Sequence, residues 1–153
     1  MTSEEYGYIL YNGCYGGYTV SNQAHKALKK GMTKEEYESF HRYDRSQWSR
    51  SHPKLIELFN EKGWEWVSGS CAKLRVFQYP LKYKNFITIK EYDGLESCNI
   101  DFARAYNDVI EQFLKRHDEH PELTVADLKK EITEFKLDKE KYSAQTYDDD
   151  DDD

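Results

Sequence analysis

The stretch that most constrains the fold comes near the start of the chain, where a strand, a glycine loop and a helix follow one another. Residues 6–12 are aromatic and aliphatic without helical spacing, which predicts a buried strand. Three glycines lie within the next five residues, where the backbone must bend sharply or pass close to another segment. Ser21 then suits the N-cap of a helix over residues 22–30. The rest of the chain must pack against this strand and close this loop.

Hydrophobic spacing predicts the remaining elements. Aromatic and β-branched residues between 73 and 92 favour strands, and the Asp93-Gly94 pair favours a tight turn into a further short strand. Together the elements indicate an α+β domain, a small mixed or antiparallel sheet of about three to four strands packed with about five helices. We expect a loop at 44–51 and fraying beyond residue 136. The expected helices are 22–30, 33–43, 53–62, 100–116 and 124–135, and the expected strands are 6–12, 73–79, 85–92 and 95–98.

Charge is distributed unevenly along the 153 residues. The formal net charge is −7, and six negative charges come from Asp148 to Asp153, which leaves −1 for the rest. The pattern predicts a single α+β domain over residues 1–140 and a disordered acidic tail over 141–153, because the tail repels itself. A nearly neutral domain without a broad cationic face argues against nucleic acid as a partner.

The three cysteines, Cys14, Cys71 and Cys98, are odd in number and widely spaced. No export signal and no apolar run of membrane length accompanies them. This combination favours reduced thiols in an intracellular protein without a membrane partner. Cys71 and Cys98 are expected to act as small buried hydrophobes.

Three kinds of chemistry could use the glycine loop. In the first, the backbone amides of the loop and of the following helix start bind an anionic ligand, because the helix dipole adds positive charge there. Glycine spacing excludes a standard phosphate-binding or dinucleotide-binding loop. The ligand-binding residues would be Tyr15, Gly16, Gly17 and Ser21.

In the second, Cys14 is a nucleophilic thiol, placed where a strand end meets a helix start and the thiolate is favoured. Its base would be His25, His41 or His52, with Asp93 orienting it. In the third, the glycines only let the turn close while Cys14 packs as a small apolar residue. No cofactor is expected. The histidines at 117 and 120 lack the further ligands that a zinc site needs, so no metal site is expected either.

Three segments resemble motifs of an uncharacterised family from bacteriophages and large DNA viruses. They are residues 14–21 (Cys-Tyr-Gly-Gly-Tyr-Thr-Val-Ser), 74–80 (Leu-Arg-Val-Phe-Gln-Tyr-Pro) and 89–96 (Ile-Lys-Glu-Tyr-Asp-Gly-Leu-Glu). Residues 50–55 resemble a family motif less closely, since the family more often carries acidic residues before the proline. Tyr18 also departs from the more usual Phe. The resemblance spans roughly half the chain and implies a viral protein, but it brings no known activity.

We therefore expect a small viral binding module whose glycine loop holds an anionic ligand or a protein partner. The first alternative is a cysteine-dependent hydrolase or transferase with Cys14, His25 and Asp93. The second is a virion or interaction protein that makes its contact through helices 100–116 and 124–135. Each would place the protein in the host cytoplasm or in the virion.

Overall fold

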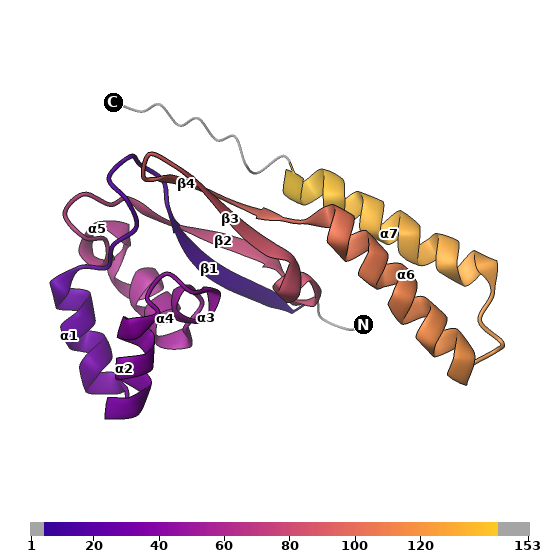
Figure 1. The fold of residues 1–153 in the computed structure, drawn as a ribbon, viewed down its shortest axis with the longest axis horizontal. Helices are drawn as coiled ribbons and strands as arrows, with labels where there is room; N and C mark the ends of the chain where they lie inside the picture. Colours follow the sequence, from indigo (N-terminus) through magenta and orange to yellow (C-terminus); the bar gives the residue numbers. More distant parts are fainter. Residues whose placement is uncertain (1–4, 144–153) are drawn as a thin grey trace. The chain divides into compact units, whose positions relative to one another are not determined.

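The computed structural model describes residues 5–143, and within them it mixes seven α-helices and one 3₁₀-helix with four strands (Figure 1). This confirms the predicted α+β class. Strand β1 (Tyr6–Asn12) pairs antiparallel with β2 (Leu74–Pro80), and β3 (Ile87–Tyr92) pairs with β4 (Leu95–Ile100) across the Asp93-Gly94 turn. The strands thus form two two-stranded sheets instead of the single sheet expected.

Side chains explain why no third strand joins β1. The register pairs Tyr6 with Pro80 and Asn12 with Leu74. On its other edge, the Leu10 carbonyl accepts a hydrogen bond from the Arg50 guanidinium at 3.3 Å, and the Asn12 amide donates to the Glu96 carboxylate at 2.8 Å. Backbone groups that a neighbouring strand would pair are instead satisfied by side chains.

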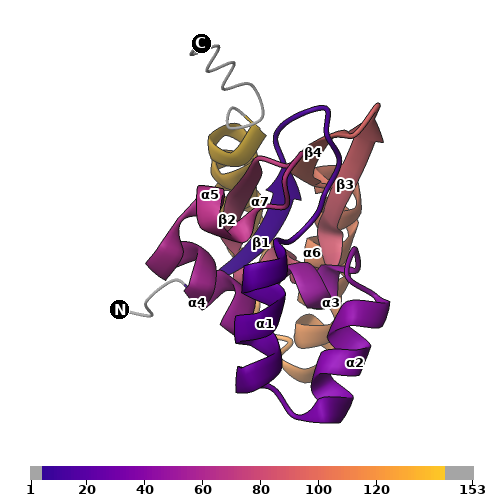
Figure 2. The same cartoon turned by 90° about the vertical axis from the view of Figure 1, so that its left-hand side faces the viewer.

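Four helices share one apolar core with the β1–β2 sheet, the last two of them in contact with its strands and the first two packed on other helices. They are α1 (Asn22–Gly31), α2 (Lys34–Arg42), α4 (Pro53–Lys62) and α5 (Trp64–Val67), and Figure 2 shows α1 and α2 side by side. Ser21 and Thr33 cap α1 and α2 as predicted, each accepting from the amide three residues on. The core they share is apolar: Leu10, Tyr18, Ala24, Leu28, Met32, Phe40, Leu55, Ile56, Val67, Ala72 and Leu74.

The loop predicted at 44–51 is wrong over residues 47–50, although residues 44–46 and 51 do form turns and bends. Helix α3 (Gln47–Arg50) forms there, begins at a Ser46 cap and buries both Ser49 and Arg50. The segment lacks a hydrophobic pattern because its buried side chains are polar, with Ser49 donating to the Phe40 carbonyl at 3.1 Å. Tertiary hydrogen bonds therefore stabilise α3, and its sequence lacks the hydrophobic periodicity that would predict a helix.

The chain divides into two units. Within the described residues, the first holds 5–82 and 89–98, and the second holds 83–88 and 99–143. In the second unit, α6 (Phe102–Glu119) packs on α7 (Val125–Ser143). Rings from these helices and from the 3₁₀-helix η1 (Leu81–Phe86) form an aromatic cluster with centroid separations of 5.5–6.2 Å. Its members are Tyr83, Phe102, Tyr106 and Phe135. The predicted single domain over 1–140 stays a prediction.

Helix α7 extends well past residue 136, so the predicted fraying is wrong over 136–143. The Tyr83 hydroxyl donates to the Asp138 carboxylate at 2.6 Å, and Tyr142 is buried. These contacts hold the last turns in place. The acidic tail predicted from residue 141 lies outside the described residues from 144 onward. None of the described helices combines the length and apolar character needed to cross a membrane.

Candidate functional site

The glycine loop leaves β1 and is tied at once to the segment before β2. The Gly13 amide donates to the Lys73 carbonyl at 2.8 Å, which continues the β1–β2 ladder by one step. Farther along, Val20 and Ser68 form an isolated bridge, and the Ser21 amide donates to the Val67 carbonyl at 2.8 Å. Both ends of the loop are therefore fixed to one neighbouring segment.

Asn12 holds the start of the loop from inside. Its side-chain amide donates to the carbonyls of Cys14 at 2.6 Å and Gly94 at 2.9 Å. Its side-chain oxygen accepts from the Lys73 amide at 2.9 Å and from the Cys14 thiol at 3.4 Å. Both donors and both acceptor positions of this fully buried amide are used, so it joins three chain segments.

The β3–β4 turn packs directly on the loop. A side chain on Gly94 would overlap the Tyr15 carbonyl and would lie 2.9 Å from the Gly17 nitrogen. A side chain on Gly16 would overlap the carbonyl of Cys71. Gly17 differs, because it has open space around it and a φ of 85°. Two of the segments that carry the family resemblance, 14–21 and 89–96, therefore meet at this point.

Beneath this contact lies a buried ion pair. The guanidinium of Arg50 donates to both Glu96 carboxylate oxygens, at 2.9 and 2.8 Å, and the two side chains are 3% and 5% exposed. Arg50 also donates to the Arg45 carbonyl at 2.9 Å. A bidentate pair with further hydrogen bonds on each partner satisfies the condition under which buried charges are tolerated.

Tyr18 completes what we call the buried polar cluster, which is Asn12, Tyr18, Arg50 and Glu96. The Arg50 guanidinium lies 3.9 Å from the centre of the Tyr18 ring. The Tyr18 hydroxyl is buried and has no hydrogen-bond partner among the described residues. Burial raises the pKa of this phenol far above its usual value, although the Arg50 charge opposes that shift. It therefore stays protonated.

Sequence reasoning missed the roles of Asn12, Arg50 and Glu96. One signal was present, because Glu96 shares its strand face with Cys98 and Ile100, and residues two apart on a strand point the same way. All three are buried. Nothing in the sequence around Arg50 marks it as the partner.

The structure does not join Cys14 to a base. Its thiol donates to the Asn12 side chain and, at 3.1 Å, to the Cys71 carbonyl. Within residues 5–143 no hydrogen bond links it to His25, His41 or His52. His52 instead bonds Glu36 at 2.7 Å and accepts from the Lys54 amide.

His25, the predicted base, lies on α1 among aromatic rings. Its Nδ1 is 3.2 Å from the Tyr37 hydroxyl, and its ring meets those of Phe40 and His41 edge to face. Burial lowers the pKa of His25, and the nearby His41 lowers it further. The neutral form that a base needs is thus favoured, but the ring is engaged within the α1–α2 pair.

The other predicted site residues are half-buried or exposed. Ser21 serves α1 as its cap and donates to the Trp66 carbonyl at 2.7 Å. Tyr15 is 64% exposed and Tyr92 is 78% exposed, and Asp93 beside it is exposed too. We call residues 14–17 and 92–94 the loop–turn surface. It presents two tyrosine rings on a frame fixed from below by the buried polar cluster.

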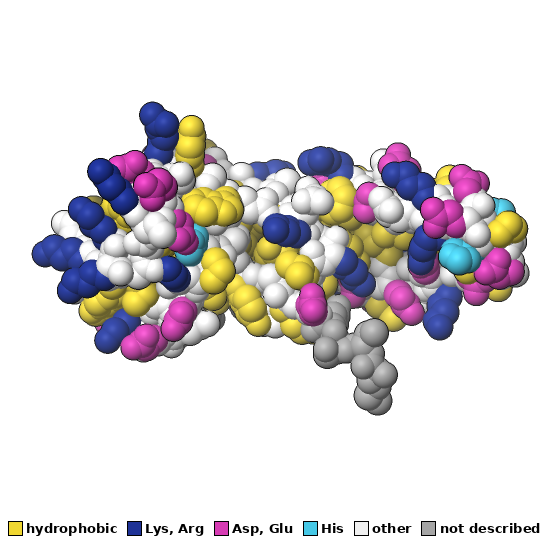
Figure 3. Space-filling view, turned by 90° about the horizontal axis from the view of Figure 1, so that it is seen from below, with side chains coloured by type: hydrophobic (Ala, Val, Ile, Leu, Met, Phe, Trp, Pro, Cys, Tyr) yellow, Lys and Arg dark blue, Asp and Glu magenta, His cyan; other side chains and the backbone are white. Residues whose placement is uncertain are grey.

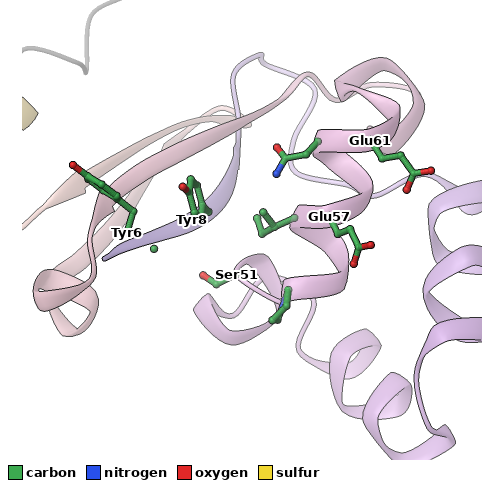
Figure 4. A pocket seen from close by; sticks show the side chains of 9 residues that line it. Tyr6, Tyr8, Ser51, Glu57 and Glu61 are labelled. Atoms are coloured by element: carbon green, nitrogen blue, oxygen red, sulfur yellow. The ribbon is translucent and has the colours of Figure 1, made fainter. Parts of the chain in front are cut away.

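A groove of about 760 Å³ lies elsewhere, between the first half of β1 and helix α4. Figure 4 shows Tyr6 and Tyr8 on the strand, with Ser51 between the strand and α4, and the carboxylates of Glu57 and Glu61 directed away from the strand. None of the predicted site residues lines it.

Charged side chains of both signs are intermixed on the face drawn in Figure 3. Within the described residues, no three histidine, cysteine, aspartate or glutamate side chains lie close enough to hold a metal ion. Comparison of the chain with protein-family models, with curated proteins and with solved structures finds no match. The viral resemblance stays a prediction, and function must be argued from the geometry of the site.

Proposed function

We propose that the chain is a small viral binding module that recognises a protein partner through the loop–turn surface. The observation that carries this is that two highly exposed tyrosines, Tyr15 and Tyr92, lie on two segments whose backbones are in contact through Gly94. Tyrosine supplies large contact area with a polar tip, and it is enriched where proteins bind one another.

Rigidity beneath the surface supports the same proposal. Asn12 bonds to residues of both segments, and Glu96 bonds to Asn12 and to Arg50. A preorganised surface loses little conformational entropy on binding, so more of its contact energy appears as affinity.

An anionic ligand held by the Gly16 and Gly17 amides is the alternative. The exposed Asp93 carboxylate belongs to the turn that touches this loop and would repel an anion. The Ser21 side chain already occupies the Ala24 amide at the start of α1. Both features favour the protein partner over the anion.

The test is photo-crosslinking followed by an affinity measurement. A photoreactive phenylalanine at position 15 should trap a partner in cells that contain it, and the purified partner should then be titrated calorimetrically. We expect Tyr15→Ala and Tyr92→Ala each to weaken binding about tenfold or more, as central aromatic contacts do. Tyr43→Ala is the matched control, since Tyr43 is 60% exposed at the end of α2.

Equal loss with Tyr43→Ala, or no loss with either of the other two, would rule out the loop–turn surface. Gly17→Ala separates binding from folding better than Gly16→Ala. At Gly17 the added methyl has open space and strains only the backbone, whereas at Gly16 it overlaps Cys71. Binding lost with Gly17→Ala, at a nearly unchanged unfolding midpoint, would place the loop in the interface.

A cysteine-dependent hydrolase or transferase with Cys14 as nucleophile is the second candidate. The Cys14 thiol is half-buried and lies in the loop itself, which is the observation in its favour. Alkylation rates across pH decide it: an activated thiol reacts fast well below pH ~8.5, and a rate that follows an ordinary thiol excludes it.

A virion or interaction role through α6 and α7 is the third candidate. Leu114, Val125 and Leu137 are exposed on these helices, at 55%, 68% and 62%. Apolar side chains in such positions suit a helical contact with another protein. Measurement of the mass in solution tests self-association. A protein that stays monomeric at all accessible concentrations would exclude self-association through these helices.

A further inference from the structure

The Cys14 thiol lies against the backbone of Cys71, although the two cysteines are 57 positions apart in the sequence. The Cys14 sulfur is 3.1 Å from the Cys71 carbonyl oxygen. A side-chain carbon on Gly16 would stand 2.9 Å from the Cys71 Cβ, so the loop backbone passes directly over Cys71. Both cysteines are free thiols.

The strand register brings the backbones of the two residues close together, although it does not by itself align their side chains. The β1–β2 ladder continues through the Gly13–Lys73 hydrogen bond, and the next step would set Cys14 opposite Ala72, one residue from Cys71. Side chains one residue apart on a strand point to opposite faces. The approach of Cys14 to Cys71 therefore depends on the loop, which leaves the ladder after Gly13 and directs the Cys14 thiol to the Cys71 carbonyl.

The surroundings of the sulfurs differ in a way that assigns each a role. Cys71, which was predicted to be buried, is instead exposed, at a turn where the Ala72 amide donates to the Gly69 carbonyl. Cys14 is half-buried, with its thiol held by Asn12 and by Cys71 itself. An oxidant in solution therefore meets Cys71 first, and Cys14 is the thiol positioned to react with what forms there.

We propose that Cys14 and Cys71 form a peroxide-responsive thiol pair, which oxidises reversibly to an intramolecular disulfide. The Cys71 thiolate attacks one oxygen of a hydroperoxide, so an S–O bond forms, the O–O bond breaks and the other oxygen leaves as water or alcohol. Cys14 then attacks the sulfenic sulfur, so the S–S bond forms, the S–O bond breaks and water leaves. Two thiols are oxidised and one hydroperoxide is reduced.

Cys98 provides an internal control. It is buried on β4, and burial raises its pKa to about 12, so it is not a nucleophile at neutral pH. This pair does not depend on the proposed binding function, because it is defined by thiol geometry alone. Its oxidised form would cross-link the glycine loop to the segment that precedes β2.

The experiment is disulfide mapping of the full chain. Reduced protein is treated with hydrogen peroxide, blocked with iodoacetamide and digested with trypsin without reduction. Cleavage puts the three cysteines on separate peptides, residues 1–26, 63–73 and 91–104. We expect the first two peptides to be linked, with an intact mass lower by two hydrogens, and dithiothreitol to restore both thiols.

Single variants test the order of the two steps. Cys14→Ser should leave a sulfenic acid at Cys71 that dimedone traps. Cys71→Ser should slow the loss of the Cys14 thiol at least about tenfold, because the exposed thiol is gone. Cys98→Ala is the matched control and should form the same disulfide at the same rate.

Wild-type mapping alone can overturn the proposal, so it does not depend on any variant folding. A link that includes Cys98, a disulfide between two chains, or overoxidation of Cys71 without any link to Cys14 would each contradict it. The expected disulfide should also raise the urea midpoint of the first unit, because the cross-link restricts its unfolded chain. If the disulfide forms but the urea midpoint does not rise, the bond must strain the native loop. That result would overturn the proposal that Cys14 and Cys71 are positioned to oxidise reversibly.

Discussion

The two units are stabilised in contrasting ways. In the first, the buried polar cluster joins residues 12, 50 and 96 through directional hydrogen bonds between elements far apart in sequence. In the second, the aromatic cluster of Tyr83, Phe102, Tyr106 and Phe135 packs by edge-to-face and tilted ring contacts. A polar cluster fixes geometry but fails when one partner is lost, whereas aromatic packing tolerates adjustment. The exposed loop–turn surface rests on the polar cluster.

The largest effect should come from removing Glu96. Glu96→Ala leaves the Arg50 guanidinium buried without its counter-ion and should cost about 4 kcal/mol, within the range for breaking a buried pair. All three tryptophans, Trp48, Trp64 and Trp66, lie in the first unit, so tryptophan fluorescence during urea unfolding reports on it. Helical circular dichroism reports on both units.

We expect the fluorescence midpoint to fall sharply while part of the helical signal unfolds later. Coincident shifts in both signals would show that the two units unfold as one. Replacing both partners, with Arg50→Met and Glu96→Leu, should recover much of the loss, because no charge then remains buried. A double variant as unstable as Glu96→Ala would mean that the geometry of the pair is itself required.

An intermediate effect should come from Phe135→Ala in the second unit. Phe135 is buried and contacts three other rings, so its truncation should cost about 3 kcal/mol through lost burial and the cavity left behind. The helical signal should weaken at lower urea while the fluorescence midpoint stays in place. A change in fluorescence midpoint would contradict the separation of the units.

The smallest effect should come from mild acid. The pKa of His25 in the first unit is lowered from its ordinary value of 6.5, mainly by burial. The unfolded chain therefore binds the proton more readily, and the stability from neutral His25 is present above pH 6.5 and lost as pH falls through its folded pKa. In the second unit, hydrogen bonds from Thr124 lower the pKa of Asp127 below 3.8, so its contribution is lost only in stronger acid.

Between pH 7 and 5, the urea midpoint by fluorescence should decline slightly, and His25→Gln should flatten that decline. The late helical phase should not move over the same interval. An unchanged slope in His25→Gln would assign the acid sensitivity to a different group.

Much of the secondary structure was predictable because its signals are local. The strand at 6–12 matches β1 residue for residue, and the caps at Ser21 and Thr33 lie where hydrogen-bonding side chains precede helical spacing. Helix α3 and the last turns of α7 were missed, because polar tertiary contacts stabilise them and leave no hydrophobic period. Within the site, the position of the glycine loop was predictable, but the buried Arg50–Glu96 ion pair beneath it was not.

By itself, the sequence determined the class of the fold, the strand–loop–helix order and the position of the glycine loop, because turns, caps and amphipathic spacing depend on neighbouring residues. Only the tertiary structure decided that the sheet containing β1 has two strands and that Arg50 and Glu96 pair beneath the loop. It also decided that the Cys14 thiol contacts the Cys71 carbonyl. These contacts join residues 46 and 57 positions apart. Nothing local in a polar or thiol side chain records which distant group will satisfy it.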